Sequence, residues 1–283
     1  MNRRLFLSRF VRGAAGALCL SRTKSISSAL SPKKLTTIGA QLYTVRRELE
    51  EDFEGTLARV AALGYREVEF AGYFNHEPKE IKESLARHGL AAPSAHFDLA
   101  AWRGDLQPLI DAAHAVGHEY LLLAWTPPEE RGTLDDYRRL AELCNRAGEH
   151  LGLAGLQFAY HNHDFEFTQI DGRVPYDLLL ERMDAKLVKL EMDLYWIVKG
   201  GGKPVEYFAK WPGRFPLLHV KDMDATAKRY FTEVGRGVID FKNIFAHAGR
   251  AGVRHYFVEQ DETPGSPFDS LKISIDYLMR LEF

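Results

Sequence analysis

The stretch at residues 155–163, GLQFAYHNH, joins a short apolar run rich in β-forming residues to a polar end that carries His161 and His163. Three later stretches have the same form: KLVKLEMD at 186–193, PLLHVKD at 216–222 and HYFVEQD at 255–261. Their polar ends carry Asp193, His219 and Glu259, and the successive gaps from His161 are 32, 26 and 40 residues. Each gap has about the length of one strand plus one helix, which predicts repeated βα units and a parallel sheet.

The same alternation continues outward from these stretches over the rest of the chain. Eight strands are predicted, at 36–42, 66–71, 92–97, 119–124, 155–161, 187–193, 215–220 and 254–260. Helical patterns lie at 53–63, 78–88, 105–116, 133–151, 175–183, 240–249 and 266–281. No GxGxxG motif follows the first strand, so an open dinucleotide-binding sheet lacks its main signal. The pattern predicts an α/β fold of one domain over residues 33–283, a closed (β/α)₈ TIM barrel.

Two kinds of residue mark the predicted helix ends. Polar residues at Asp105 and Thr133 are typical of helix N-termini. Glycines separate helical stretches from the strands that follow, at Gly64, Gly89, Gly117, Gly152 and Gly252. Glycine tolerates the left-handed conformation that often ends a helix, so these five positions are predicted helix ends.

The N-terminus differs in composition from the rest of the chain. The segment Asn2 to Ser8, NRRLFLS, resembles a twin-arginine export signal and precedes a weakly apolar stretch and a small-residue site near Ala29. We therefore expect residues 1–29 to be a signal peptide and the protein to be periplasmic or otherwise exported. The alternative is a basic N-terminus without a targeting function, which would leave the protein in the cytoplasm.

Charge and cysteine content narrow the classes of function. Residues 1–29 contain six Lys or Arg and no acidic residue, so their removal leaves 31 basic against 39 acidic residues, a net charge of −8. Binding to phosphate backbones needs a basic face, which argues against a nucleic-acid partner. No run is apolar enough to span a membrane. Only Cys144 would remain, in a helical pattern typical of a core residue, so a thiolate zinc site is excluded.

The strand ends supply the composition of a metal site. Barrel active sites lie at the carboxyl ends of the strands, where His161, Asp193, His219 and Glu259 are predicted to meet. Ionisable groups that point into an apolar barrel need a partner, and a divalent metal would supply one. Two imidazoles and two carboxylates suit Mn²⁺, Zn²⁺ or Co²⁺. The alternative for any single strand-end histidine is an ordinary hydrogen-bonded loop residue.

Other residues near the same strand ends are candidates for substrate contact. His163, Glu191, Lys221 and Asp261 share strand faces with the four predicted ligands, because residues two apart on a strand point the same way. Further candidates lie after other strands: Gln41, Glu69, His96, Trp102, Trp125, Trp196 and Arg236. For Glu69 a buried polar contact and a bond to a substrate hydroxyl remain open, and His96 would donate to a substrate oxygen. Arg236 would hold an anionic or hydroxylated substrate end, or form a loop salt bridge.

Several segments together resemble a known family, the sugar phosphate isomerase/epimerase superfamily of xylose isomerase-like barrels. These are IGAQLYTVR, LGYREVEFAG, SAHFDL, YHNHDFEF, MDLYWIVKGG, LHVKDMD and VGRGVIDF before FVEQD, and they cover about residues 36–282. The resemblance implies one divalent metal, most often Mn²⁺, with Zn²⁺, Co²⁺ or Mg²⁺ as alternatives. It implies a ligand set of Glu, Asp, His and Glu, of which the last three match Asp193, His219 and Glu259.

The chain departs from that family at the first ligand. Many relatives read Glu-Asn-His where this chain has His161, Asn162 and His163. Epimerases of the family use two metal-bound glutamates on opposite faces of the substrate, so this substitution argues against their symmetrical proton relay. It also lowers the ligand charge from −3 to −2, which leaves a bound metal a stronger Lewis acid. The related inosose dehydratases resemble this chain in having histidine near this position.

These points favour an isomerase or lyase that acts on a keto-sugar, keto-glycoside or keto-inositol. The enzyme would remove a proton α to the carbonyl, giving an enediolate, and a β leaving group could then depart. Glu259 would be the base, with Lys221 or His163 as proton donor or oxyanion stabiliser. The alternatives are a ketose 3-epimerase or aldose–ketose isomerase, in which His163 or Glu191 replaces the missing base, and a catalytically inactive sugar-binding barrel. A small-molecule sugar is the expected partner, and a homo-oligomer is a further expectation.

Overall fold

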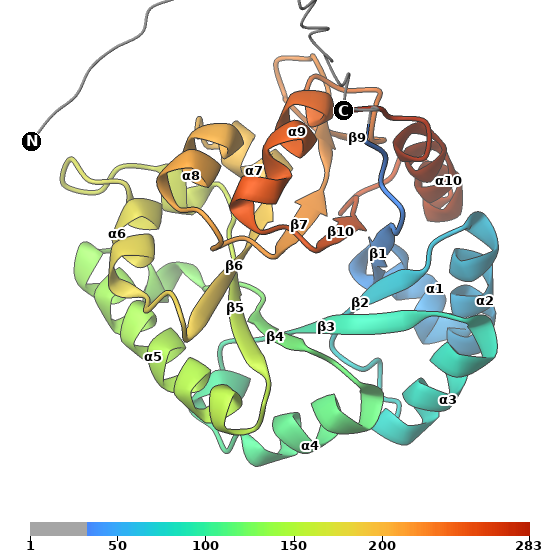
Figure 1. Cartoon of the computed structure of the whole chain (residues 1–283), viewed down its shortest axis with the longest axis horizontal. Helices are drawn as coiled ribbons and strands as arrows, with labels where there is room; N and C mark the ends of the chain where they lie inside the picture. Colours follow the sequence, from blue (N-terminus) through green and yellow to red (C-terminus); the bar gives the residue numbers. More distant parts are fainter. Residues whose placement is uncertain (1–32) are drawn as a thin grey trace, which may run out of the picture. The chain divides into compact units, whose positions relative to one another are not determined.

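The computed structural model describes residues 33–283, which form a closed barrel of parallel strands surrounded by helices (Figure 1). The order around the barrel is β1-β10-β7-β6-β5-β4-β3-β2, so sequence neighbours pair and β10 closes the barrel on β1. The strands are β1 (Gly39–Gln41), β2 (Glu67–Ala71), β3 (Ala91–Phe97), β4 (Tyr120–Leu123), β5 (Gln157–His161), β6 (Val188–Asp193), β7 (Leu217–Val220) and β10 (His255–Val258). The predicted fold class is confirmed, and each strand lies within its predicted range except β3, which begins one residue earlier.

The helices cover the outside of the barrel. They are α1 (Arg46–Glu51), α2 (Phe53–Leu63), α3 (Pro78–His88), α4 (Gln107–Val116), α5 (Leu134–Leu153), α6 (Pro175–Arg182), α7 (Leu194–Lys199), α8 (Pro204–Lys210), α9 (Phe241–Ala251) and α10 (Pro267–Leu278). α5 begins with a capping box in which Thr133 and Asp136 each accept the other's backbone N–H. The sequence did not predict α1, α7, α8 or the hairpin of β8 (Asp222–Met223) and β9 (Phe231–Thr232).

Four of the five predicted glycine helix ends are confirmed. Gly64, Gly89, Gly117 and Gly252 all take the left-handed conformation directly after a helix. The prediction for Gly152 is wrong, because α5 continues through it to Leu153. The left-handed position is instead Gly155, with φ of 75°, where the chain leaves the last turn and enters β5.

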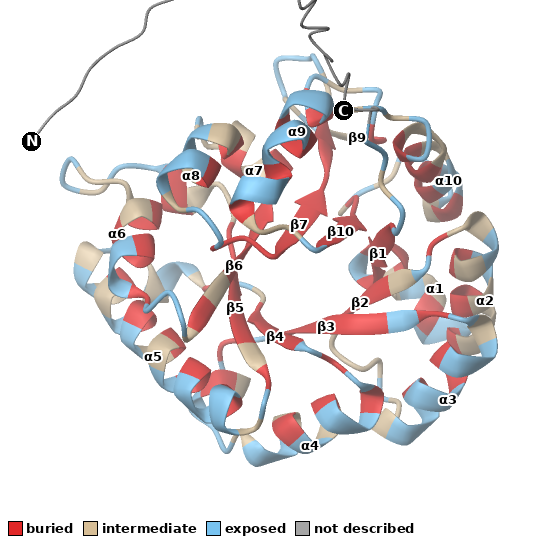
Figure 2. Cartoon of the chain, in the orientation of Figure 1, coloured by how far each residue is buried: buried red, intermediate tan, exposed pale blue. Residues whose placement is uncertain are grey.

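The hydrophobic core consists of two apolar regions. The larger region lies between the strands and the inward faces of the helices, which Figure 2 shows as buried stripes on helices with exposed outer faces. Cys144 belongs to it, as predicted. A smaller cluster fills the barrel interior and consists of Tyr120, Leu122, Ala159, Leu217 and Phe257. The Phe257 ring takes the space beside Gly39, where an added Cβ would lie 2.4 Å from the ring.

The ends of the described segment lie together, since Lys33 and Phe283 exchange two backbone hydrogen bonds of 2.8 and 3.0 Å. No helix among residues 33–283 has the length and apolar character needed to cross a membrane. The predicted signal peptide at residues 1–29 lies outside the described residues and stays a prediction.

Candidate metal centre

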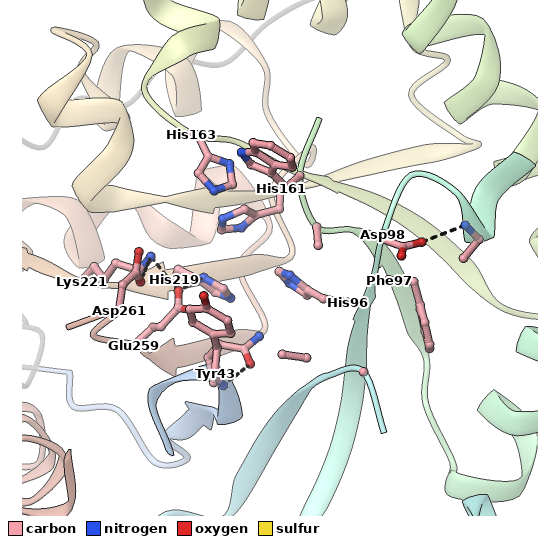
Figure 3. A pocket seen from close by; sticks show the side chains of 16 residues that line it. Tyr43, His96, Phe97, Asp98, His161, His163, His219, Lys221, Glu259 and Asp261 are labelled. Atoms are coloured by element: carbon pink, nitrogen blue, oxygen red, sulfur yellow. Dashed lines mark hydrogen bonds and ion pairs between the residues drawn. The ribbon is translucent and has the colours of Figure 1, made fainter. Parts of the chain in front are cut away.

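The four predicted ligands meet at the carboxyl end of the barrel. The shortest approach joins His219 Nδ1 and Glu259 Oε2, at 2.8 Å. Asp193 Oδ2 lies 3.8 Å from His219 Nδ1 and 3.9 Å from His161 Nε2. All four side chains are buried, with at most 6% of any residue exposed. We call these four residues the outer cluster; Figure 3 shows His161, His219 and Glu259 on the wall of the cavity above it.

These separations suit a single small cation. Metal–ligand bonds of about 2.0–2.2 Å place neighbouring donor atoms about 3.0–3.5 Å apart. The donor atoms lie 2.8 Å apart for His219 and Glu259, 3.8 Å for His219 and Asp193, and 3.9 Å for His161 and Asp193, close to that range. His219 Nδ1 and Asp193 Oδ2 make no hydrogen bond of good geometry and are offset by ion pairs with Glu259 and Lys221, at 2.8 and 3.0 Å. Two imidazole nitrogens and two carboxylate oxygens therefore fit a divalent metal here.

Lys221 lies beside the outer cluster, and its ammonium group forms ion pairs with the carboxylates of that cluster. Its Nζ is 3.0 Å from Asp193 Oδ2, 2.8 Å from Glu259 Oε2 and 2.7 Å from Asp261 Oδ1. The ammonium group thus offsets charge that would otherwise be concentrated at three buried or half-buried carboxylates. The spacing of Asp261 predicts only that it shares a strand face with Glu259, and its pairing with Lys221 depends on the tertiary structure.

A second set of polar side chains lies deeper in the barrel. We call Gln41, Glu69, His96 and Glu191 the inner layer. Glu69 Oε1 accepts hydrogen bonds from Gln41 Nε2 at 2.7 Å and from His219 Nε2 at 2.6 Å. Glu191 Oε2 accepts from His96 Nε2 at 2.8 Å and from His161 Nδ1 at 3.0 Å. Both glutamates are fully buried. Because His161 and His219 contact the inner layer with one ring nitrogen and the outer cluster with the other, the two groups of residues share these imidazoles.

Burial and charge set the protonation of the two shared imidazoles. Burial, helped by the charges of His219 and His163, lowers the pKa of His161 well below its usual range. Burial also disfavours a charged His219, but Glu191, Glu259 and Glu69 outweigh it and raise its pKa well above the usual range. A metal ligand must be unprotonated, so His161 is ready to bind and His219 would release a proton.

The pKa values of Asp193, Glu259 and Lys221 are shifted as well. Burial raises the pKa of the Asp193 carboxyl to about 6. Burial opposes ionisation of Glu259, but Lys221 and His219 hold its pKa below the usual range. Burial also disfavours the ammonium of Lys221, and Asp193, Asp261 and Glu259 together raise its pKa above the usual range. Glu259 is therefore a carboxylate and Lys221 an ammonium at neutral pH.

A cavity of about 730 Å³ opens above the outer cluster. Its lining includes Gln41 and His96 together with the charged or imidazole residues His161, His163, His219, Lys221, Glu259 and Asp261. Tyr43 and Trp125 also line it and keep 43% and 44% of their surface exposed. This volume lies within the range of small-molecule sites, about 300–1,000 Å³.

The remaining predicted contact residues lie elsewhere. Glu69 has no exposed surface and is not part of the cavity lining, which matches the buried-contact alternative. Trp196 packs against Tyr195 and Phe231, with ring centroids 4.7 and 5.6 Å apart, and lies near His163. The Arg236 side chain is 59% exposed, lies 3.5 Å from Glu233 and is also outside the lining.

His163 is held in place by the loop that follows β5. Its backbone N–H donates to Glu166 Oε2 at 2.8 Å, and its ring stacks on Phe165. Glu166 is fully buried and accepts a second hydrogen bond from Tyr160. The role of Glu166 was not predicted from sequence, where its one signal is a carboxylate in the otherwise aromatic FEF run.

The fold and the centre define a class, a (β/α)₈ barrel with a buried cluster of His, Asp and Glu that can hold a metal ion. Residues 57–281 match the family model described as xylose isomerase-like TIM barrel, and the chain belongs to that family. The match covers most of the chain, as the resemblance in sequence predicted.

Individual relatives agree with this family. The chain is 26% identical over 266 residues to an inosose dehydratase from Geobacillus kaustophilus (strain HTA426), covering 80% of this chain and 86% of the relative. It is similar to the crystal structure of a sugar phosphate isomerase/epimerase from Parabacteroides distasonis ATCC 8503, with a TM-score of 0.73, 30% identity and coverage of 91% and 97%. The IOLI protein, solved with a zinc atom, has a TM-score of 0.67 and 11% identity, covering 85% and 95%. The IOLI protein, at 11% identity, shows the fold alone, whereas the inosose dehydratase and the sugar phosphate isomerase/epimerase support an enzyme.

Proposed function

We propose that this chain is a divalent-metal-dependent isomerase or lyase that removes a proton α to the carbonyl of a keto-sugar, keto-glycoside or keto-inositol. The observation that supports this most is the outer cluster itself: donor atoms of Asp193, His219 and Glu259 lie within 4.8 Å of one another beside a cavity, and His161 Nε2 lies 3.9 Å from Asp193 Oδ2. A bound divalent ion would supply Lewis acidity, which stabilises negative charge on a carbonyl oxygen. The donor set suits Mn²⁺, our first choice, and also Zn²⁺, Co²⁺ or Mg²⁺.

Within this proposal Glu259 is the base. It lines the cavity, and its lowered pKa keeps it ionised. Lys221 lines the same cavity and lies 2.8 Å from Glu259, so its ammonium can stabilise an oxyanion or return a proton. His163 also faces the cavity, but burial followed by the charge of Lys221 lowers its pKa well below the usual range. A neutral imidazole is a poorer proton donor, so we assign the donor role to Lys221.

The cavity favours an uncharged polyol as substrate. Tyr43 and Trp125 offer half-exposed aromatic faces, on which a sugar ring can pack its C–H face. Among the described residues that line the cavity, Lys221 is the one Lys or Arg, and three carboxylates already surround it. A phosphate group would need further basic donors. We therefore expect unphosphorylated ketoses, keto-glycosides or keto-inositols to bind better than sugar phosphates.

Elimination is favoured over epimerisation by the identity of residue 161. Epimerisation needs a second group to return a proton on the opposite face, and His161 stands where many relatives have that glutamate. Glu191 could not replace it, because it is fully buried and does not line the cavity. The inosose dehydratase relative is consistent with an elimination. The epimerase alternative is kept because the relative from Parabacteroides distasonis is named an isomerase/epimerase.

The test is product analysis with metal-loaded protein in D₂O. Panels of 3-keto-glycosides, keto-inositols and free ketoses would be followed by NMR and mass spectrometry, with metal-free protein and His219→Ala as controls. The proposal expects a dehydrated or cleaved product that depends on metal. A deuterated epimer as the only product would favour the epimerase alternative. Tight sugar binding without any turnover in the metal-loaded protein would contradict the enzyme and favour a sugar-binding barrel.

A further inference from the structure

We infer that Glu191 is a positioning residue that holds the imidazoles of His96, His161 and His219 through one carboxylate oxygen and so aims two of them at the metal. The inference rests on the proposed function, because it concerns the metal ligands of that site. It assigns Glu191 neither the role of ligand nor that of base.

The geometry that carries the inference is a convergence of three ring nitrogens. Glu191 Oε2 lies 2.8 Å from His96 Nε2, 3.0 Å from His161 Nδ1 and 3.0 Å from His219 Nε2. The ring centroids of the three histidines lie 4.5–5.3 Å from one another. One buried oxygen is thus the common neighbour of imidazoles from β3, β5 and β7. Glu69 supports it by accepting from Gln41 and from His219 at 2.7 and 2.6 Å.

These contacts determine which nitrogen of each ligand keeps its lone pair. A carboxylate only accepts hydrogen bonds, so the nitrogen facing it must carry the proton. His161 then donates from Nδ1, which leaves Nε2 free on the side of Asp193 Oδ2, 3.9 Å away. His219 donates from Nε2 to Glu69 Oε1, with Glu191 Oε2 3.0 Å away, and its Nδ1 faces Glu259 and Asp193. That Nδ1 is paired with Glu259 and would give up its proton to a metal, so the two nitrogens that the inner layer does not contact both face the outer cluster. Partners of this kind fix the tautomer and the orientation of metal-binding histidines.

The position of Glu191 excludes a direct role for it at the substrate. Like Asp193, two residues further along β6, it has no exposed surface and does not line the cavity; it differs in that its Oε2 faces three imidazoles, whereas Asp193 groups with His219 and Glu259. A buried carboxylate is costly unless it is paired, and the ring N–H groups provide the pairing. The inner layer and the outer cluster are therefore successive layers of one centre.

The barrel offers a matched control at its other end. Glu67, at the start of β2, pairs with His255 Nδ1 at 2.9 Å, which is the same kind of contact. His255 precedes Glu259 by four residues on the same strand, roughly 13 Å at the usual rise. Replacing Glu67 removes one part-buried His–carboxylate pair without touching a predicted ligand.

The experiment compares Glu191→Gln, Glu69→Gln and Glu67→Gln in the full chain. Affinity for Mn²⁺ and Co²⁺ would be measured by competition with a chelator, together with the visible absorption of the Co²⁺ protein. We expect Glu191→Gln to weaken binding by about 10- to 100-fold, the effect typical of lost outer-shell partners, and to change the Co²⁺ spectrum. Glu69→Gln, which removes a direct partner of one ligand only, should have a smaller effect. Glu67→Gln should bind as the wild type does.

A second measurement needs no substitution at Glu191. In ¹⁵N-histidine-labelled wild type, long-range ¹H–¹⁵N spectra should show His161 with its proton on Nδ1. The opposite tautomer would overturn the inference, as would wild-type affinity and spectrum in folded Glu191→Gln. Two ions per wild-type chain, one of them lost with Glu191→Gln, would also overturn it by making Glu191 a ligand. Failure of the wild type to bind any metal would instead contradict the proposed function.

Discussion

The two ends of the barrel interior pair histidine with glutamate for different purposes. At the amino end, Glu67 and His255 form one pair next to the apolar cluster of Tyr120 and Phe257. At the carboxyl end, Glu191 and Glu69 each contact more than one imidazole, and those imidazoles face further carboxylates. The same residue types thus make an isolated contact at one end and a layered centre at the other. The difference lies in the second ring nitrogens of His161 and His219, which face Asp193 and, for His219, also Glu259.

The largest expected effect comes from removing a ligand at the carboxyl end. His219→Ala should lose metal binding and lower activity by more than about 100-fold, since losing a ligand exceeds the loss of its supporting partners. Activity with saturating Mn²⁺ and the metal content after dialysis measure this. His255→Ala is the control at the amino end and should keep both. Equal losses of metal binding and activity in the two variants would contradict the proposal that only the carboxyl end of the barrel holds the metal.

Lys221→Met should give a large loss of stability in the metal-free protein. Three carboxylate oxygens lie within 3.0 Å of its Nζ, and removal of a buried partner typically costs about 3–5 kcal/mol. Bound metal should restore part of the loss, because it also neutralises Asp193 and Glu259. Urea unfolding with and without Mn²⁺ measures both effects. Lys189→Met, which removes contacts to backbone carbonyls near the start of β6, should cost less.

That prediction would be wrong if Lys221→Met were as stable as the wild type without metal. It would also fail if Mn²⁺ stabilised the variant no more than it stabilises the wild type, because the cation would then not share the role of the ammonium.

Metal affinity should increase with pH through the range where Asp193 ionises. Burial raises the pKa of this carboxyl from 3.8 to about 6, so it is mostly protonated at pH 5. Ionisation of Asp193 alone predicts a gain in Mn²⁺ affinity of about tenfold between pH 5 and pH 7, and the proton that His219 releases on binding increases this gain. In the metal-free protein the sign for stability is opposite: a raised carboxyl pKa favours folding at low pH, and this contribution is lost as pH rises from 3.8 to about 6. Chelator competition across this pH range tests the expected rise in metal affinity, and urea unfolding of the metal-free protein tests the expected fall in stability.

The smallest effect on the centre is expected from Glu67→Gln at the amino end. The variant loses the carboxylate of a part-buried hydrogen bond, which costs at most about 1–3 kcal/mol of stability. Its Mn²⁺ affinity and activity should match those of the wild type. A clear loss of metal affinity in the folded variant would show that the two ends are coupled through the interior.

The sequence predicted the architecture well, because strands and helices leave periodic signals. The predicted helices at 53–63 and 78–88 have the observed bounds of α2 and α3. The short helix α7 was missed, since six residues directly after a strand carry too little periodicity. The four predicted ligands were visible because each ends an apolar run, and the barrel brings them together.

The inner layer could not be predicted in the same way. Glu191 was visible as a residue that shares the face of Asp193, but its neighbours come from β3, β5 and β7 and depend on the closed barrel. Lys221 likewise reaches carboxylates on β6 and after β10. Arg236 looked like a substrate contact from sequence, whereas its exposed side chain lies near Glu233. Such contacts depend on tertiary structure, which spacing along one strand does not encode.

Metal analysis of wild-type protein purified without chelator tests the central claim most directly. We predict about one divalent ion per chain, retained on gel filtration and lost in Asp193→Ala, with Glu67→Gln retaining it. A folded wild type that takes up no Mn²⁺, Zn²⁺, Co²⁺ or Mg²⁺ would contradict the account.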